Sequence, residues 1–549
     1  MRHKKGRVRI NDPDVFLGNQ DYAEDSRLEL PIRADSAQIL LGLMFLIFAL
    51  FSFKIFNLQI VEGQAYQEQS EQNRLQHSVI LAERGLIYDI QGEELVWNEN
   101  SKEQREYPER IYKNMDGLGH ILGYARPPAK DSSGFYYRDS FEGVSGSEIE
   151  FDELLKGNNG RKIVETNAQG NITSENLIRP TVPGENITLT IDAELTSKLH
   201  ESLKTIIDQV GYKGGASVIM DIDTGDVLAL TSFPEIKSDI LFSGKDEETI
   251  GGYATDPLNP YLNRAIEGAY APGSVIKPFL AVAALEEEII GEWTNILSTG
   301  QLTIPNPYFP DQPSIFRDWR AHGLVDMREA LAVSSNVYFY VIGGGYKDQE
   351  GLGIERINSY SRLFGFGTPT GIRLGNEALG VVPNPEWKKE HFNGEEWRLG
   401  DTYHTSIGQY GYLVTPIQMA RATGVIANGG TLVTPRIATN VPVEKTKLDI
   451  EPAHLDVVRQ GMKLAVEDGT ARGLNYTNLE FGGKTGTAEV GTTKGFVNSW
   501  VIGFFPYNDP QYAFATVLEH GPSKNLIGAT AAMRNFFDWA RYERPELFE

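Results

Sequence analysis

The sequence contains no cysteine among its 549 residues. Disulfide bonds, thiolate metal ligands and a cysteine nucleophile are therefore excluded. If the chain is exported, packing alone must stabilise it. A chain of this length is also too long for one ordinary hydrophobic core, so we expect two or more domains.

Basic residues are scarce relative to acidic ones. The 51 Lys and Arg residues are outnumbered by 74 Asp and Glu residues, which gives a formal net charge of −23. A surface that binds nucleic acid needs an excess of positive charge, so the composition argues against that class. The hydrophobic content of 41% is that of a folded globular chain, and the acidic excess indicates a well-hydrated surface.

Only one long hydrophobic run is present. Residues 36–53 carry no charge, and the apolar character continues beyond Lys54 to Val61. Such a run spans a bilayer as a helix with a rise of about 1.5 Å per residue, and Lys54 can reach the interface. A buried core helix is rarely apolar on every side, and a cleavable signal would not follow about 35 mostly polar residues. We predict an uncleaved transmembrane anchor at 36–58.

The charges before the anchor bear on its orientation. Arg2, Lys4, Lys5, Arg7 and Arg9 favour a cytoplasmic N-terminus, but they lie far from the span. Residues 1–35 are therefore predicted to be a cytoplasmic tail, although charge alone leaves the orientation open.

Two patterned regions follow the anchor. Residues 59–182 begin with a polar stalk at 64–76 and contain no nucleophile–base pair, which predicts a non-catalytic membrane-proximal domain. Residues 185–545 predict one α+β domain. Its expected elements are a strand at 187–191, a helix at 193–210, a hairpin at 216–220 and 227–230, and a strand pair at 500–505 and 512–518.

Three short motifs occur in a fixed order in the second region. They are Ser274-Val275-Ile276-Lys277, Ser334-Ser335-Asn336 and Lys484-Thr485-Gly486, which read S-x-x-K, S-x-N and K-T-G. Each motif alone is weak evidence, since each also occurs by chance on a solvent-facing helix or turn. Their order within one continuous region predicts acyl transfer by an active serine.

The S-x-x-K motif supplies a nucleophile and a base. Ser274 follows Ala-Pro-Gly and precedes a helical pattern at 279–288, so we expect it near a helix N-terminus. The spacing of three residues places Lys277 on the same helix face. Lys277 can remove the serine proton only when neutral. Its pKa must therefore be lowered by burial and a nearby positive charge, for which Lys484 is the candidate.

The other two motifs supply a proton relay and a binding strand. We expect the Ser334 hydroxyl to bridge the two lysines, and Asn336 to bond the substrate amide or Lys277. A helix cap is the alternative for this segment. Residues 482–489 predict a strand edge that substrate approaches closely, where a carboxylate can bind Lys484 and the hydroxyls of Thr485 and Thr487 beside Gly486. The backbone N–H groups of Thr487 and Ser274 could form an oxyanion hole.

A Ser-His-Asp hydrolase is disfavoured. No G-x-S-x-G elbow surrounds Ser274, and the scheme above needs no histidine. We interpret His404 and His520, which lie near motif-like stretches, as structural.

The motifs and their flanking sequences resemble class B penicillin-binding proteins, within the penicillin-binding protein and serine β-lactamase superfamily. The resemblance runs from the anchor to about residue 540. Residues 400–409, with Arg317-Asp318-Trp319 and His322-Gly323, resemble the elongation-type subgroup more than the division-type one. The other matching segments are 84–89, 143–148, 263–278 and 413–416.

The resemblance implies a fold and an activity. The fold is α+β: a single transmembrane helix, an elongated β-rich pedestal or dimerisation domain, and a transpeptidase domain whose central antiparallel sheet is flanked by helices. The activity is that of a peptidoglycan D,D-transpeptidase for cell elongation and shape. Ser274 would attack the D-alanyl-D-alanine bond of a stem peptide, and an amine from a neighbouring strand would take the acyl group. β-Lactams would acylate the same serine.

The resemblance also implies a location and partners. The family's active site faces away from the cytoplasm, which settles the orientation of the anchor. The substrate would be stem peptides on lipid-linked nascent glycan, and a SEDS-family glycosyltransferase would bind through the anchor and the membrane-proximal domain. No cofactor is expected.

One departure concerns a metal. Some elongation-type relatives bind zinc with two Asp, one His and one Cys beside the S-x-N segment. Asp318 and His322 match two of these ligands, but the cysteine position corresponds to Ser335. Since the site lacks its thiolate, we expect no metal.

Three alternatives stay open from sequence. A D,D-carboxypeptidase or β-lactamase would use water in place of the amine, but no deacylating carboxylate is evident. A division-type transpeptidase would share all three motifs. A non-catalytic scaffold would be expected to lose a motif, and a β-lactam sensor would need a cytoplasmic output domain larger than residues 1–35.

Overall fold

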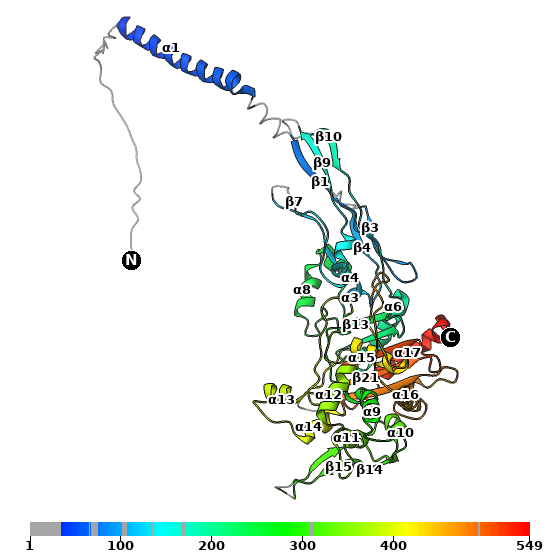
Figure 1. The fold of residues 1–549 in the computed structure, drawn as a ribbon. Helices are drawn as coiled ribbons and strands as arrows, with labels where there is room; N and C mark the ends of the chain where they lie inside the picture. Colours follow the sequence, from blue (N-terminus) through cyan, green and yellow to red (C-terminus); the bar gives the residue numbers. More distant parts are fainter. Residues whose placement is uncertain are drawn as a thin grey trace, which may run out of the picture. The chain divides into compact units, whose positions relative to one another are not determined.

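The structure is a computed structural model that describes residues 34–64, 66, 75–100, 107–132, 136–166, 172–306, 309, 311–491 and 495–549. The predicted tail up to residue 33, and residues 65 and 67–74 of the predicted stalk, lie outside the described residues. The chain divides into two compact units. One comprises Met1–Gln76 and Ile163–Glu175, and the other comprises His77–Lys162 and Asn176–Glu549 (Figure 1).

The first unit contains the apolar helix. Helix α1 (Ala34–Phe56) continues into the π-helical turn η1 (Asn57–Val61). Residues 38–61 form the one helix in the described part of the chain that is long and apolar enough to cross a membrane. None of its most apolar 18-residue stretch is buried. A core helix of a soluble protein would be mostly buried, so this surface fits the predicted anchor.

The N-terminal part of the second unit is built of short elements. A four-stranded sheet has the order β11-β2-β3-β4. The expected strand at 187–191 is shorter than predicted, and it pairs in parallel with β2 rather than joining the large sheet described below. The bounds are β2 (Ile87–Tyr88), β3 (Glu94–Glu99), β4 (Glu109–Tyr112), β11 (Ile187–Thr188), α3 (Gly119–Leu122), α4 (Gly146–Glu150) and α5 (Asp152–Leu155).

Three smaller sheets contain the other strands before residue 180. One three-stranded sheet has the order β1-β9-β10, and two short pairs join β5 to β8 and β6 to β7. The bounds are β1 (Leu75–Ile80), β5 (Ala125–Arg126), β6 (Ala129–Lys130), β7 (Tyr136–Arg138), β8 (Glu142–Gly143), β9 (Gly160–Thr166) and β10 (Ile172–Arg179).

A buried ion cluster joins two of the family-like segments. The Glu148 carboxylate on α4 accepts hydrogen bonds from Arg84 Nε at 2.6 Å, Arg110 Nε at 2.9 Å and the Tyr112 hydroxyl at 3.1 Å. Burial alone would raise the pKa of Glu148, but the positive charges of Arg110 and Arg84 outweigh it and lower the pKa. The cluster therefore holds α4 against β4 and the loop before β2.

The central sheet of the second unit is antiparallel and has the order β13-β12-β22-β21-β20. It contains both predicted strand pairs, although they lie far apart in sequence. Strand β20, which carries the K-T-G motif, lies at the edge, as predicted. The bounds are β12 (Gly214–Asp221), β13 (Val227–Phe233), β20 (Gly482–Val490), β21 (Phe496–Phe505) and β22 (Tyr512–Pro522).

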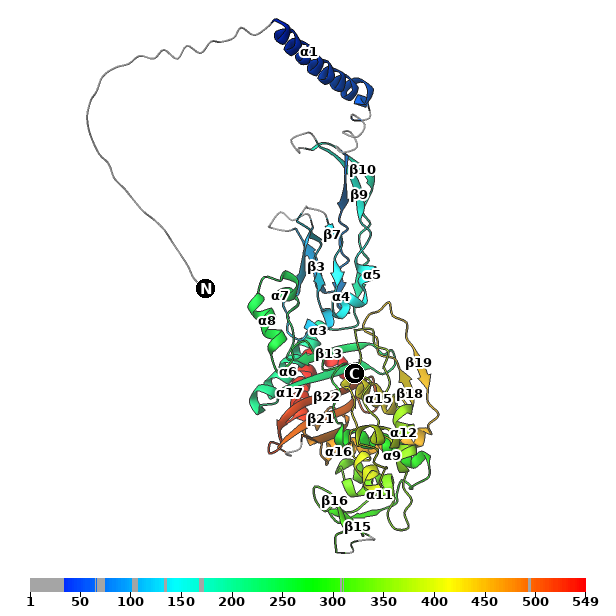
Figure 2. The ribbon, with the colours of Figure 1, turned by 90° about the vertical axis from the view of Figure 1, so that its left-hand side faces the viewer.

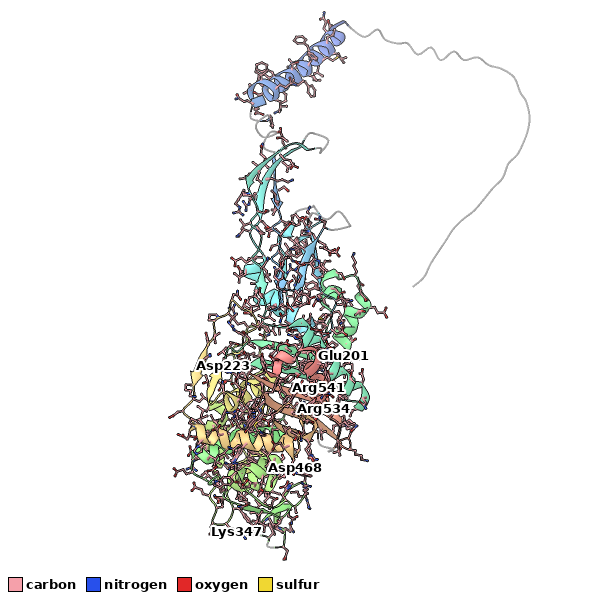
Figure 3. All side chains as sticks on the ribbon, turned by 90° about the vertical axis from the view of Figure 1, so that its right-hand side faces the viewer. Glu201, Asp223, Lys347, Asp468, Arg534 and Arg541 are labelled. Atoms are coloured by element: carbon pink, nitrogen blue, oxygen red, sulfur yellow. The ribbon has the colours of Figure 1, made fainter. Side chains whose placement is uncertain are left out.

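The two faces of this sheet bury alternate residues. On β22, Ala513, Ala515 and Val517 belong to one apolar core, and Phe514 and Leu518 belong to another. The second core contains α6 (Ala193–Val210), with the predicted bounds, and α17 (Ala529–Glu543), which lie side by side (Figures 2 and 3). The first core contains α9 (Lys277–Glu286) and α15 (Pro416–Ala427).

Helices and small hairpins complete the domain around α9. The short strand pairs are β14 with β17, β15 with β16, and β18 with β19. The bounds are α7 (Ser238–Ser243), α8 (Glu247–Thr255), η2 (Gly273–Ile276), β14 (Ile296–Ser298), β15 (Gln301–Ile304), β16 (Ser314–Arg317), β17 (Gly323–Val325), α10 (Met327–Ala332), α11 (Asn336–Gly344), α12 (Gly353–Leu363), α13 (Pro385–His391), α14 (Leu399–Thr405), β18 (Thr431–Val433), β19 (Lys445–Lys447), α16 (Pro452–Glu467), η3 (Arg472–Leu474) and η4 (Pro545–Phe548).

The Glu148 ion cluster should contribute to the stability of the fold. Glu148→Gln removes the carboxylate that pairs with buried Arg110 and one of the two that pair with buried Arg84, whose other partner is Asp152 at 2.7 Å, so we expect the free energy of unfolding to fall by about 3 kcal/mol. Urea denaturation of the full chain in detergent measures it. The matched control is Glu153→Gln, which breaks the surface pair with Lys156 and should cost less than about 0.5 kcal/mol. Equal losses in the two variants would contradict the role of the cluster.

Candidate active site

The three sequence motifs come from three different elements and meet beside the edge of the central sheet. Ser274 lies on the 3₁₀ turn η2, and Lys277 begins α9. Ser334 directly precedes the N-cap of α11, and Lys484 lies on β20, which packs against η2. Ser274 is half-buried, whereas both lysines are fully buried.

Lys277 is held by the S-x-N motif. Its Nζ donates hydrogen bonds to the Ser334 carbonyl oxygen and to Asn336 Oδ1, both at 2.8 Å, and lies 3.3 Å from Ser334 Oγ. Burial lowers the pKa of Lys277 to about 7, although the negative charge of Asp318 acts in the opposite direction. A lysine with this pKa is partly neutral at physiological pH, as a general base requires.

Lys484 lies on the other side of the same hydroxyl. Its Nζ donates to Ser334 Oγ and to the Thr485 carbonyl oxygen, both at 2.8 Å. Burial and the positive charge of Lys277 lower the pKa of Lys484 well below its ordinary value. The Ser334 hydroxyl therefore bridges the two lysines, as predicted. The expected cause differs in part: burial is the main cause of the lowered pKa at both lysines, and the charge of the other lysine contributes only at Lys484.

The backbone at the S-x-N motif has an uncommon conformation. Ser334 has a φ of +58°, in the left-handed region that non-glycine residues seldom adopt. The following residue, Ser335, is the N-cap of α11, and its Oγ accepts a hydrogen bond from the Tyr338 N–H. Both sequence interpretations of this segment therefore hold, since Ser335 caps the helix while Ser334 bridges the lysines.

Glycines bring η2 and β20 into close contact. Gly273 has a φ of +55°, and a Cβ atom there would lie 2.6 Å from the Thr487 carbonyl oxygen. A Cβ atom on Gly486 would lie 2.8 Å from the Pro272 carbonyl oxygen. Only glycine tolerates both approaches, so these residues allow the backbones at Ser274 and Thr487 to lie side by side. The Thr487 side chain is exposed and that of Thr485 is half-buried, with its hydroxyl 2.7 Å from Thr470 Oγ1.

The two histidines singled out from sequence pack against aromatic rings. His404 lies 5.4 Å from the ring centre of Phe316, and His520 stacks on Phe496 at 4.2 Å. These contacts fit the structural role predicted for both.

The zinc ligands of some relatives have no full counterpart beside the S-x-N motif. Asp318 Oδ2 already accepts hydrogen bonds from Ser335 Oγ at 2.8 Å and the Val337 N–H at 2.9 Å. His322 Nε2 lies 3.6 Å from Asp318 Oδ1. Within the described part of the chain, no group of three or more His, Cys, Asp or Glu residues could hold a metal ion. One carboxylate, one imidazole and a donating hydroxyl do not fit a tetrahedral zinc site.

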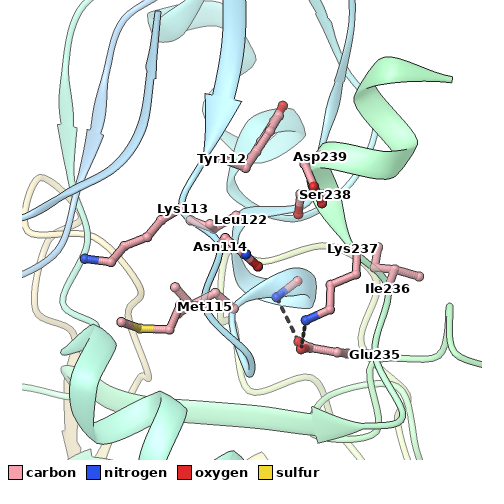
Figure 4. Close-up of a pocket in the computed structure, with 12 residues that line it drawn as sticks. Tyr112, Lys113, Asn114, Met115, Leu122, Glu235, Ile236, Lys237, Ser238 and Asp239 are labelled. Atoms are coloured by element: carbon pink, nitrogen blue, oxygen red, sulfur yellow. Dashed lines mark hydrogen bonds and ion pairs between the residues drawn. The ribbon is translucent and has the colours of Figure 1, made fainter. Parts of the chain in front are cut away.

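A separate small cavity lies away from the three motifs. It has a volume of about 20 Å³ and lies between residues 112–122 and residues 235–239 (Figure 4). Glu235 accepts hydrogen bonds there from the Gly117 and Gly119 N–H groups at 2.9 and 3.0 Å, and from Lys237 Nζ at 3.3 Å. These contacts join residues 117–119 to the residues that follow β13. Neither side of this junction carries a recognisable motif, so the sequence gives no signal for it.

Comparison with known proteins identifies the family. The sequence model for the penicillin binding protein transpeptidase domain matches residues 215–538, and the model for the penicillin-binding protein dimerisation domain matches residues 103–189. This chain belongs to the penicillin-binding proteins. The predicted family and the predicted α+β fold class are therefore confirmed.

Relatives narrow the subgroup. The peptidoglycan D,D-transpeptidase MrdA of Haemophilus influenzae is 29% identical, and the alignment covers 92% of each chain. A penicillin-binding protein structure (PBP2 in complex with MreC, from Helicobacter pylori) has a TM-score of 0.71 at 26% identity and covers 86% of this chain and 99% of that one. A chain of a peptidoglycan synthase complex that polymerises and crosslinks has a TM-score of 0.72 at 25% identity, covering 92% and 98%.

Proposed function

We propose that Ser274 is the nucleophile of this chain, which is a serine-type peptidoglycan D,D-transpeptidase of the elongation subgroup. The observation that carries the proposal is the Ser334 hydroxyl shared by two buried lysines, one of which lies a single helical turn from Ser274. A serine hydroxyl needs an adjacent base to become nucleophilic, and Lys277 with a pKa of about 7 is suited to that task.

The acylation step follows from these positions. Neutral Lys277 accepts the proton of Ser274 as its oxygen attacks the carbonyl carbon of the D-alanyl-D-alanine bond. The resulting oxyanion accepts hydrogen bonds from the backbone N–H groups of Ser274 and Thr487. The bond to the terminal D-alanine then breaks, and the Ser334 hydroxyl passes a proton to the departing amine and takes one from a neighbouring lysine. The product is an ester on Ser274 plus free D-alanine.

The second half-reaction reverses the proton flow. The amine of a neighbouring stem peptide attacks the ester, its proton returns through Ser334 and Lys277 to the Ser274 oxygen, and the new amide crosslinks the strands. Asn336 holds Lys277 in place through its Oδ1. Thr485, Gly486 and Thr487 line the edge of β20, where the carboxylate and backbone of the donor peptide bind beside Lys484.

We further propose the arrangement of the chain in the cell. Residues 1–35 form a cytoplasmic tail, 36–58 a single-pass anchor in the cytoplasmic membrane, 59–182 the pedestal domain and 185–545 the extracytoplasmic transpeptidase domain. The exposed apolar surface of α1 supports the anchor. The substrate, nascent peptidoglycan, lies outside the cytoplasm, which supports the orientation.

Covalent labelling tests the nucleophile. The full chain in detergent should gain the mass of one benzylpenicillin molecule per chain, and Ser274→Ala should gain none, because the variant lacks the nucleophilic oxygen that forms the ester. Mass spectrometry of the intact protein makes the measurement. An adduct on the variant, or none on the unaltered chain, would overturn the assignment.

A membrane-impermeant fluorescent penicillin applied to intact spheroplasts should label the same serine, and labelling only after lysis would reverse the proposed orientation.

The pKa of Lys277 predicts the pH dependence of acylation. Because the neutral lysine is the active form, the acylation rate should rise with pH and level off above about pH 7. Below about pH 6 it should fall by about tenfold per pH unit. Stopped-flow labelling with a fluorescent penicillin gives the profile, and Lys277→Arg should be slow at every pH. A rate that falls as the pH rises through 7 would contradict a neutral lysine base.

The anchor helix is the expected contact site for a partner protein in the membrane. We propose that a SEDS-family glycosyltransferase binds α1 and the membrane-proximal domain, so that polymerised glycan reaches the transpeptidase directly. Replacement of residues 34–56 by an unrelated transmembrane helix of equal length should abolish co-purification of the glycosyltransferase from membranes. Ser274→Ala serves as the control and should retain it. Undiminished co-purification with the replaced helix would place the contact elsewhere.

A further inference from the structure

The strongest unassigned feature is the Asp318 side chain. It lies in the loop between β16 and β17, its side chain is fully buried, and it contacts the S-x-N motif without contacting Ser274 or Lys277 through any described hydrogen bond. The mechanism above leaves it without a role. Its position beside the S-x-N motif, together with the poor fit to zinc, suggests a different structural role for Asp318.

Asp318 gathers hydrogen-bond donors from two elements at one oxygen. Its Oδ2 accepts from Ser335 Oγ at 2.8 Å, from the Val337 N–H at 2.9 Å and from Ser298 Oγ at 3.2 Å. Ser298 ends β14, whereas Ser335 and Val337 belong to the start of α11. Hydrogen bonds to a charged acceptor are roughly twice as strong as neutral ones, so this carboxylate ties the helix start to the hairpin.

The other carboxylate oxygen fixes Asp318 itself. Oδ1 accepts from the Trp319 N–H at 2.9 Å, and the Asp318 N–H donates to the Gly300 carbonyl oxygen at 2.9 Å. The acceptor is therefore anchored by its own backbone as well as by the residues it holds. Val337 is the second residue of α11, so Asp318 also serves as a helix cap supplied from outside the helix.

The residues held by Asp318 alternate with the residues that hold Lys277. Ser335 and Val337 bond Asp318, whereas Ser334 and Asn336, their chain neighbours, bond Lys277. A shift of the helix start would therefore move the Ser334 carbonyl and the Asn336 amide away from the lysine. Since Ser334 has a left-handed backbone, the segment needs such external support.

We propose that Asp318 is a positioning residue, which holds the Ser334–Asn336 segment against Lys277 by direct hydrogen bonds to Ser335 and Val337. The inference rests on the proposed function. The serine that stands at the cysteine position, Ser335, donates to the carboxylate where a thiolate would ligate a metal. The site in this chain is thus complete without zinc.

The test compares two helix-capping aspartates in the full chain in detergent. Asp318→Ala should lower the limiting rate of acylation by a fluorescent penicillin by about tenfold to a hundredfold. The dissociation constant of the preceding non-covalent complex should change by less than about threefold, because Asp318 does not line the binding strand. Asp326→Ala is the matched control. Asp326 caps α10 by accepting the Glu329 N–H at 2.9 Å and has no described hydrogen bond to the S-x-N motif, so its loss removes a helix cap but should leave acylation unchanged.

A second variant and a metal analysis test the inference further. If Asp318→Ala does not fold, Ser335→Ala removes one donor, leaves the carboxylate and should give a smaller loss of the same limiting rate. A limiting rate unchanged from that of the unaltered chain, in whichever variant folds, overturns the inference. So does zinc that co-purifies in stoichiometric amount and whose removal with EDTA slows acylation. If the unaltered chain is not acylated at all, the proposed function fails first, and Ser274→Ala distinguishes that case.

Discussion

The burial of two lysine side chains beside one serine hydroxyl is the constraint on which the site depends. Two ammonium groups that share the Ser334 oxygen repel each other and have lost their hydration, so protonating both is costly. Burial lowers the pKa of both lysines, and the positive charge of Lys277 lowers that of Lys484 further. A lysine with a lowered pKa releases its proton more easily, which a reaction that removes one proton and returns another requires.

The fold supplies the rigidity that this arrangement needs. Lys484 lies on a strand of the central sheet, Lys277 begins a helix buried in the core, and Ser334 is fixed by the turn between α10 and α11. Glycines at 273 and 486 then let the serine turn approach the edge strand to backbone contact. Because β20 is an edge strand of the sheet in the described part of the chain, its outer side has no neighbouring strand there, which is the arrangement that lets peptides add as a further strand.

Local patterns predicted much of this from sequence. The helical stripe at 193–210 and the alternating strands at 216–220 and 512–518 are set by neighbouring residues, and the structure confirms them. The three motifs lie together in the structure, as expected, because acyl transfer by an active serine needs all three sets of side chains at one site. The strand at 187–191 is shorter than predicted, and sequence did not indicate its partner, since Ile187 and Thr188 pair with β2, 100 residues earlier, and no local pattern encodes that.

Asp318 illustrates what sequence could not supply. Its acceptor role depends on the pairing of β14 with β17, which brings Ser298 within 3.2 Å of Ser335, 37 residues away in the chain. From sequence, the serine at the cysteine position could be interpreted only as the loss of a zinc ligand. In the folded chain the same hydroxyl donates to the Asp318 carboxylate and accepts a hydrogen bond from the Tyr338 N–H, so it holds the start of α11 in a way that no local sequence pattern indicates.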